Sequence, residues 1–547
     1  MINFFLNCYY TVILAWAFHF IFSSFTSQLP WTRCDQSWNT PACRVFTNQP
    51  INSSIIENTT HISNVSLITV DATTEYWERR VLKISDGIHD IGTVQWDLAL
   101  CLLLTWVIIY LCIWKGIKTS AKMVVGGSRQ ETLGPGFVLL GTRQQGVPVI
   151  LGELVLPCGF DPVALSFTIM YVTALLPYVF MITLLIRTAL LDGASNGLIH
   201  YLKPDWSKLT DMTVWSDAGT QIFFSYSIGL GVLTAFGSYN KIQHNSFRDC
   251  CLFALANTFT SLLSGCVIFC TLGYMSYISN IPLNQIAESG PGLGFIVYPK
   301  AIGTMPGSPF WSICFFIMII LLGIDSMFAG VEGFIAAAGD YFPHALANKW
   351  IRCIFVGCVC ITSYLVGLSM VTNGGMYVFQ LFDYYSGSRI ILIVGLLESS
   401  VIGYIYGTSR RTLPQCEQPG SDNHPHTCNR TQDHCIHNQP PSLIPIISPT
   451  STFNVKLPLS ASFSTVTIAN DSSSSQKDDA YTKILFIISV IVYEELTYKR
   501  ASLHEPYHFP GWSVKLGWFM ASSSIFLIPI VMIIKILRTS GTFLQVI

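Results

Sequence analysis

The stretch Asp217–Gly231, DAGTQIFFSYSIGLG, places polar side chains and two glycines inside a long apolar tract. Every backbone N–H and C=O group in hydrocarbon needs a hydrogen-bond partner. The stretch is therefore either a packed helix, with serines bonded to its own backbone, or a helix that unwinds near Gly229 and Gly231. The stretch alone does not separate these alternatives. Unwinding would expose carbonyl and hydroxyl oxygens, which are suitable ligands for small cations.

The composition of the chain indicates a membrane protein. Of its 547 residues 51% are hydrophobic and only 11% are charged, whereas about a quarter of the residues in a soluble protein are charged. A single soluble core cannot bury this much apolar surface, so we expect an all-α polytopic membrane protein. The net charge of −1 and the lack of a basic run give no indication of nucleic-acid binding.

About ten apolar tracts approach the roughly 20 residues that a spanning helix needs. They lie near residues 1–26, 96–116, 171–191, 218–240, 249–278, 308–338, 353–371, 375–407, 481–497 and 512–537. The first tract has no basic segment before its apolar residues, so we interpret it as a span and not as a signal peptide. The fourth tract contains the opening stretch.

Basic residues predict which side of the membrane each loop faces. Lysines and arginines follow the second, fourth, sixth, eighth and last tracts, which places those loops in the cytoplasm if the spans alternate. The segment 27–95 is then extracellular. It carries three N-x-[ST] acceptors for glycans, Asn52, Asn58 and Asn64. It also holds Cys34 and Cys43, which suit a disulfide in an oxidising compartment.

Two segments depart from the pattern of apolar spans. Residues 126–170 contain no clear span, and residues 411–480 are rich in Ser, Pro, Asn and His. We expect the first to be an atypical insert and the second a low-complexity cytoplasmic loop.

Asp325 is the second candidate for function, because it lies within the apolar stretch LLGIDSMFAG with no basic residue nearby. A carboxylate inside a membrane is costly and usually functional. Together with Ser326 and the Leu322 carbonyl it offers several oxygens to one sodium ion. The alternative is a protonated, hydrogen-bonded Asp325 that holds two helices together.

A third candidate is the pair Asn257 and Ser261 in FALANTFTSLLSG. Residues four apart share one face of a helix. Amide and hydroxyl donors suit an anion such as chloride, and a nearby cation would strengthen its binding.

Several motifs in one order resemble the sodium- and chloride-dependent neurotransmitter symporter family. They include CDQSWNTPAC, DAGTQIFFSYSIGLG, AESGPGLGFIVYPKA, LLGIDS and GGMYVFQLFDYYSGS. The loop 27–95 and the second span look most like the subgroup that carries taurine, GABA, creatine and betaine. The resemblance implies a leucine-transporter-like fold with inverted repeats, of which this chain has helices 3–12 and lacks helices 1 and 2.

The resemblance also implies roles for individual residues. The substrate would meet Tyr10, Phe224, Ser225, Ser227 and Gly229. One sodium ion would bind Ser225 and Asn257, and a second would bind Leu322, Asp325 and Ser326. Chloride would bind Gln221, Ser225, Asn257 and Ser261. Asp383 would belong to an outer gate, Tyr239 and Asp340 to an inner gate, and Cys34 and Cys43 to a disulfide.

We therefore expect five segments: helices 3 and 4 in 1–125, the insert 126–170, helices 5–10 in 171–410, the insert 411–480, and helices 11 (in part) and 12 in 481–547. The expected function is sodium- and chloride-coupled symport of a small zwitterionic solute, taurine- or GABA-like before glycine-like, at the plasma membrane. The alternative is a transport-inactive or regulatory fragment of such a symporter. An enzyme is not expected, because no histidine pairs with a nucleophile. The expected partners are the ions, a solute and lipid. The sequence leaves open whether the chain forms a homo-oligomer.

Overall fold

The computed structural model describes residues 1–45, 70–113, 162–237, 246–283, 290–401, 495–502 and 505–538. The candidate glycan acceptors Asn52, Asn58 and Asn64 and the gate residue Tyr239 lie outside these ranges. So do most of the two predicted inserts.

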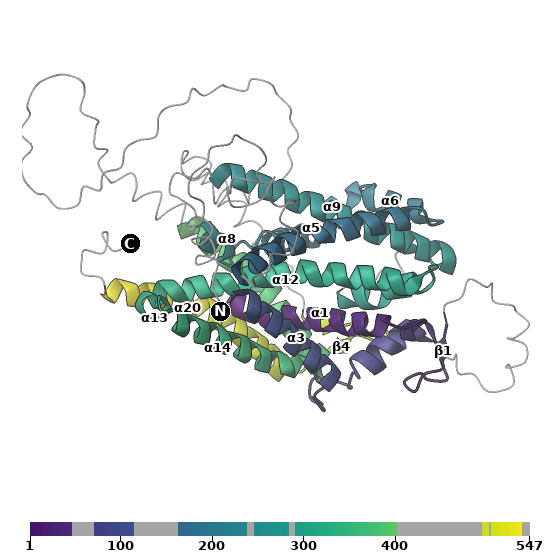
Figure 1. Ribbon diagram of the computed structural model, residues 1–547, viewed down its shortest axis with the longest axis horizontal. Helices are drawn as coiled ribbons and strands as arrows, with labels where there is room; N and C mark the ends of the chain where they lie inside the picture. Colours follow the sequence, from purple (N-terminus) through teal and green to yellow (C-terminus); the bar gives the residue numbers. More distant parts are fainter. Residues whose placement is uncertain are drawn as a thin grey trace, which may run out of the picture.

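The described part is almost entirely helical, and long apolar helices form its body (Figure 1). These are α1 (Ile2–Ser24), α3 (Trp96–Ile113), α5 (Pro162–Ala189), α9 (Ser246–Ser279), α12 (Ser308–Tyr341), α14 (Lys349–Leu368) and α20 (Gly511–Arg538). Shorter helices are α2 (Ala72–Glu75), α6 (Ala194–Leu202), α7 (Met212–Ser225), α8 (Val232–Gly237), α11 (Tyr298–Gly303), α13 (Pro343–Leu346), α15 (Gly375–Phe382) and α16 (Arg389–Ser400).

Turns of other helix types join several of these elements. They are η1 (Pro30–Thr32), η3 (Tyr76–Val81), η5 (Trp206–Thr210), η6 (Leu293–Val297), η7 (Ser369–Val371) and η8 (Asp383–Ser388). The described ranges contain two strand pairs: β1 (Cys43–Arg44) lies parallel to β2 (Val70–Asp71), and β3 (Thr497–Tyr498) lies antiparallel to β4 (Tyr507–His508).

Helix α1 packs against both α12 and α3, while α5, α6 and α9 form a neighbouring group in which α5 also contacts α12 (Figure 1). An aromatic cluster fills the core beside α1. Trp16 meets Trp77 edge-on with ring centroids 5.2 Å apart, and Phe20 stacks on Phe316 at 4.8 Å. Large buried aromatic pairs contribute strongly to packing. This cluster therefore anchors the loop between α1 and α3 to the helical core.

Six of the predicted tracts coincide with helices that could cross a membrane, and other tracts need correction. Among the described residues six helices are long and apolar enough to cross a membrane, or seven if a bent pair made by Thr173–Ala189 and Ala194–Thr210 counts as one. Helix α5 begins at Pro162, so the last residues of the predicted insert 126–170 are helical. Proline fits the first helical turn because its missing N–H would have no partner there.

Two further corrections concern other predicted tracts. In the tract 375–407, the described residues 375–401 contain α15, η8 and α16 in succession, so they are not one regular helix. The tract 481–497 extends too far, because Thr497 already pairs with His508 in a strand. β-Branched and aromatic residues such as Thr497 and Tyr498 favour that conformation.

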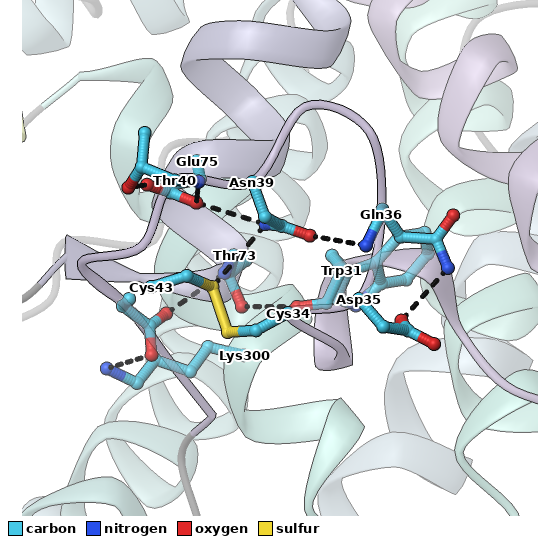
Figure 2. The surroundings of a disulfide bond; sticks show 11 residues. Trp31, Cys34, Asp35, Gln36, Asn39, Thr40, Cys43, Thr73, Glu75 and Lys300 are labelled. Carbon is cyan, nitrogen blue, oxygen red and sulfur yellow. Dashed lines mark hydrogen bonds and ion pairs between the residues drawn. A yellow bond between two sulfur atoms is a disulfide. The ribbon is translucent and has the colours of Figure 1, made fainter.

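The loop predicted to be extracellular is held by a disulfide between Cys34 and Cys43 (Figure 2). The buried carboxylate of Glu75 accepts hydrogen bonds from Asn39 Nδ2 and Thr40 N, both at 3.0 Å, and from the Thr40 hydroxyl. Lys300 at α11 forms an ion pair with Asp71 at 3.3 Å. The predicted disulfide is thus confirmed, and its loop is tied to α11.

Candidate functional site

The helix in the opening stretch is broken. Helix α7 ends at Ser225, and α8 begins at Val232. Between them Ser227, Gly229 and Gly231 have φ values of 54°, 76° and 73°. Glycine adopts this left-handed conformation without the steric penalty that a Cβ brings. The structure therefore contradicts the packed-helix alternative and agrees with local unwinding.

Most backbone N–H groups of the broken segment have acceptors, as a nonpolar environment requires. Donors at Ser227 and Ile228 reach back to the carbonyls of Phe224 and Phe223, both at 3.0 Å. The Gly229 N–H instead donates to Oε2 of Glu398, on α16, at 3.1 Å. A side chain from another helix thus supplies an acceptor that the helix itself no longer provides.

Ser225 and Asn257, predicted to share ions, are in contact. The Asn257 Nδ2 donates to the Ser225 Oγ at 2.8 Å. The neighbouring Tyr226 hydroxyl lies 3.4 Å from the Ala254 carbonyl and 3.2 Å from the Thr258 hydroxyl, both on α9. Tyr226 therefore fixes the end of α7 against α9, and this contact positions Ser225 beside Asn257.

The other two predicted chloride ligands are less closely gathered. Gln221 lies one turn before Ser225, and Ser261 lies one turn after Asn257, and both residues are exposed. Within the described ranges, no hydrogen bond joins either side chain to the Ser225–Asn257 pair. The Ser261 carbonyl accepts a hydrogen bond from the Ser264 hydroxyl at 3.0 Å.

Asp325 faces α5. Its Oδ1 accepts a hydrogen bond from the Thr173 hydroxyl at 2.5 Å. Ser326 Oγ donates to the Leu322 carbonyl at 3.1 Å, so the three predicted ligands of the second sodium ion lie within one turn of α12. The Thr173 contact joins two helices, which is also what the alternative of a structural aspartate predicts. The geometry is compatible with both.

Helix α5 connects the two polar clusters. Thr173 bonds Asp325 on α12, and Tyr178, just over one turn later, shares a hydrogen bond of 2.7 Å with Thr260 on α9. Thr260 lies one turn from Asn257. Tyr10, on α1, lies near the side chain of Ser326.

The remaining predicted residues are more scattered. Phe224 packs beside the apolar cluster of Phe223, Ile391 and Leu392. Asp383 begins the π-helical turn η8, where the Tyr9 hydroxyl lies next to its carboxylate. Asp340 is exposed near the end of α12.

Sequence reasoning missed several residues of these clusters, among them Tyr9, Thr173 and Glu398. Glu398 carries the same signal that singled out Asp325, a carboxylate inside an apolar tract. Thr173 gives no such signal, because threonines in membrane helices commonly bond their own backbone.

Comparison with known proteins identifies the family. The sodium:neurotransmitter symporter family model matches residues 1–130 and 148–416. The chain belongs to the sodium:neurotransmitter symporter family. It is 40% identical over 543 residues to the sodium- and chloride-dependent taurine transporter of Canis lupus familiaris, covering 98% of this chain and 71% of that protein. It is 38% identical over 544 residues to the human sodium- and chloride-dependent GABA transporter 2, covering 99% of this chain and 73% of that protein.

As a member of the sodium:neurotransmitter symporter family, this chain is a multi-pass transporter of the plasma membrane and not an enzyme. The all-α architecture described above is the one expected from the apolar tracts.

Proposed function

We propose that this chain is a secondary active symporter that couples sodium and chloride to the import of a small zwitterionic amino acid or amine. A taurine-, GABA- or creatine-like solute ranks first and a glycine-like solute second. The observation that carries the proposal is the contact of Asn257 with Ser225, made where α7 unwinds. The relatives named as taurine and GABA transporters support the ranking of solutes.

The Ser225–Asn257 pair offers chemistry for both ions. Because the Ser225 Oγ accepts from Asn257, its own hydroxyl proton is directed to another acceptor, such as chloride. The Asn257 carbonyl oxygen is a hard ligand suited to sodium. Binding the two ions side by side would lower the electrostatic cost of each, so we propose that their binding is coupled at this pair.

The second sodium ion is proposed to bind the Leu322 carbonyl, Asp325 and Ser326. In this scheme Thr173 is a positioning residue, because it holds Asp325 in place and approaches it from a different helix. Tyr10 is proposed to donate its hydroxyl proton to the acid group of the solute, and its position against Ser326 would link the solute to this ion. Phe224 and the backbone around Ser227 and Gly229 would complete the solute site.

Uptake of radiolabelled taurine, GABA and glycine into cells expressing the full chain tests the proposal. Sodium is replaced by choline in one arm, and chloride by gluconate in another. We expect uptake of taurine or GABA that falls to background in both arms. Unchanged uptake without sodium would remove ion coupling from the proposal.

Matched variants make the test specific to the site. Asn257→Ala removes the amide, whereas Ser264→Ala, on the same helix, removes a hydroxyl that bonds only a neighbouring carbonyl. We expect a large rise in the sodium concentration for half-maximal uptake in the first and none in the second. Absence of uptake from a chain that surface biotinylation detects at the cell surface would favour the transport-inactive alternative.

A further inference from the structure

An open cavity of about 520 Å³ lies between α1, η3 and α3, away from the proposed ion and solute site. Its polar lining consists of His19, Ser23, Arg80 and Asp97. Its apolar lining includes Phe22, Leu100 and Leu104, which are 55%, 63% and 37% exposed. One cavity therefore combines an ion pair with apolar side chains that are exposed on the surface of the bundle.

Contacts between α1, η3 and α3 hold the polar lining of the cavity in place. Arg80 Nη2 lies 2.8 Å from Asp97 Oδ2, and both side chains keep contact with solvent. The Tyr76 hydroxyl donates to the Ser23 Oγ at 2.8 Å and lies 3.5 Å from the His19 Nε2. Burial raises the pKa of Tyr76 to about 12, so the phenol stays a neutral donor at physiological pH. These bonds fix the wall behind the ion pair.

The position of the cavity places it at the membrane boundary. Helix α1 ends at Ser24, and α3 begins at Trp96, which is 71% exposed. Tryptophan is enriched where headgroups meet hydrocarbon. Leu100 and Leu104 follow one and two turns into α3 on the same face, so this apolar lining lies at the depth of the acyl chains. The turn η3, which lines the cavity, belongs to the same loop as the disulfide between Cys34 and Cys43, and a disulfide indicates the extracellular side.

We propose that this cavity binds the headgroup of a zwitterionic phospholipid of the outer leaflet. Its phosphate meets Arg80, its ammonium group meets Asp97, and its acyl chains lie along Leu100, Leu104 and Phe22. A zwitterion matches the Arg80–Asp97 pair because it brings both charges and leaves the local net charge unchanged. Anionic phospholipids are concentrated in the cytoplasmic leaflet, so they are not the expected occupants.

The proposal does not depend on transport, and photo-crosslinking tests it directly. The full chain is purified and placed in nanodiscs that contain a phosphatidylcholine probe with a diazirine in its acyl chain. Labelled peptides are then mapped by mass spectrometry. We expect labelling at 19–23 and 97–104 that excess unlabelled phosphatidylcholine or phosphatidylethanolamine suppresses. Equal suppression by phosphatidylglycerol, or suppression only by cholesterol, would overturn the proposal.

Two variants and one control make the result specific. Arg80→Gln with Asp97→Asn removes both charges at similar size, and labelling should fall about tenfold, because hydrogen bonds to charged groups are lost. Leu100→Trp fills part of the apolar lining without changing charge and should also reduce labelling, which keeps the test decisive if the double variant fails to fold. Arg33→Gln with Asp35→Asn removes an exposed ion pair outside the cavity and should change nothing. Unchanged labelling in Leu100→Trp would contradict the assignment.

Discussion

The contact between Gly229 and Glu398 leads to a quantitative prediction about the helix break. Replacing Glu398 by Leu removes the acceptor of the Gly229 N–H while keeping a side chain of similar size. A fully buried donor without a partner costs about 1–3 kcal/mol, and this part-buried bond corresponds to the lower part of that range. Opening of the segment 226–231 should therefore become easier by about 5- to 10-fold. The change is local, because the N–H groups of Ser227 and Ile228 keep their carbonyl acceptors.

Hydrogen–deuterium exchange of the purified full chain measures this opening. Peptides that contain Gly229 should exchange faster by that factor in Glu398→Leu, since amide exchange reports local opening. Glu398→Gln keeps a neutral acceptor and should show a smaller increase. Ser399→Ala serves as the matched control, because the Ser399 hydroxyl bonds only the Leu396 carbonyl of its own helix. Wild-type exchange at Gly229 in the Leu variant would refute the role given to Glu398.

Three further predictions concern other parts of the chain. Asp325→Asn should raise the sodium concentration for half-maximal uptake about tenfold or more, because hydrogen bonds to charged groups are worth about 1.5–3 kcal/mol, and it should change the corresponding chloride concentration little. Ser225→Ala should raise the half-maximal concentrations of both ions. Equal effects of the two variants on the chloride concentration would argue against separate ion clusters. Hydrogen bonds from the Thr213 hydroxyl and N–H lower the pKa of Asp211, and a lowered pKa adds stability above the ordinary pKa that is lost as the pH falls through the folded pKa. The start of α7 should thus fray in acid, as measured by exchange corrected for intrinsic rates, and Asp211→Asn should keep the cap and abolish this pH dependence. Glycosidase treatment should shift the gel mobility of the chain from cells, and a variant with all three acceptors changed to Gln should show no shift; the acceptors are Asn52, Asn58 and Asn64.

The helical architecture could be predicted from the sequence because apolar length is a strong signal. Gly229 and Gly231 next to serines indicated where a helix could unwind, but the residues alone left a packed helix as an equal alternative. The exact ends of the helices could be predicted less well. Pro162 begins α5 ahead of the predicted tract, because a proline fits the first helical turn, where its missing N–H would have no partner.

Contacts across helices marked the limit of the sequence-based predictions for the site. The sequence places Asn257 and Ser261 on one face, and the family resemblance assigned both to chloride together with Ser225. In the structure Tyr226 packs against α9, and Asn257 is the one of the two that bonds Ser225. The partner of Asp325 could not be predicted, because any of the threonines in the apolar tracts was an equal candidate for the place that Thr173 takes. Side-chain identity specifies what a residue can bind, while its partner depends on tertiary packing.

Pro177 lies in α5 between Thr173 and Tyr178, the residues that contact the two polar clusters. A proline has no N–H to donate to the carbonyl four residues earlier, here that of Thr173, so the helix bends more easily at this point. The two halves of α5 then need not tilt as one rigid rod. If both clusters hold ions, a bend at Pro177 allows one cluster to release its ion while the contact of α5 with the other cluster is kept. The two ions would then be released in a fixed order.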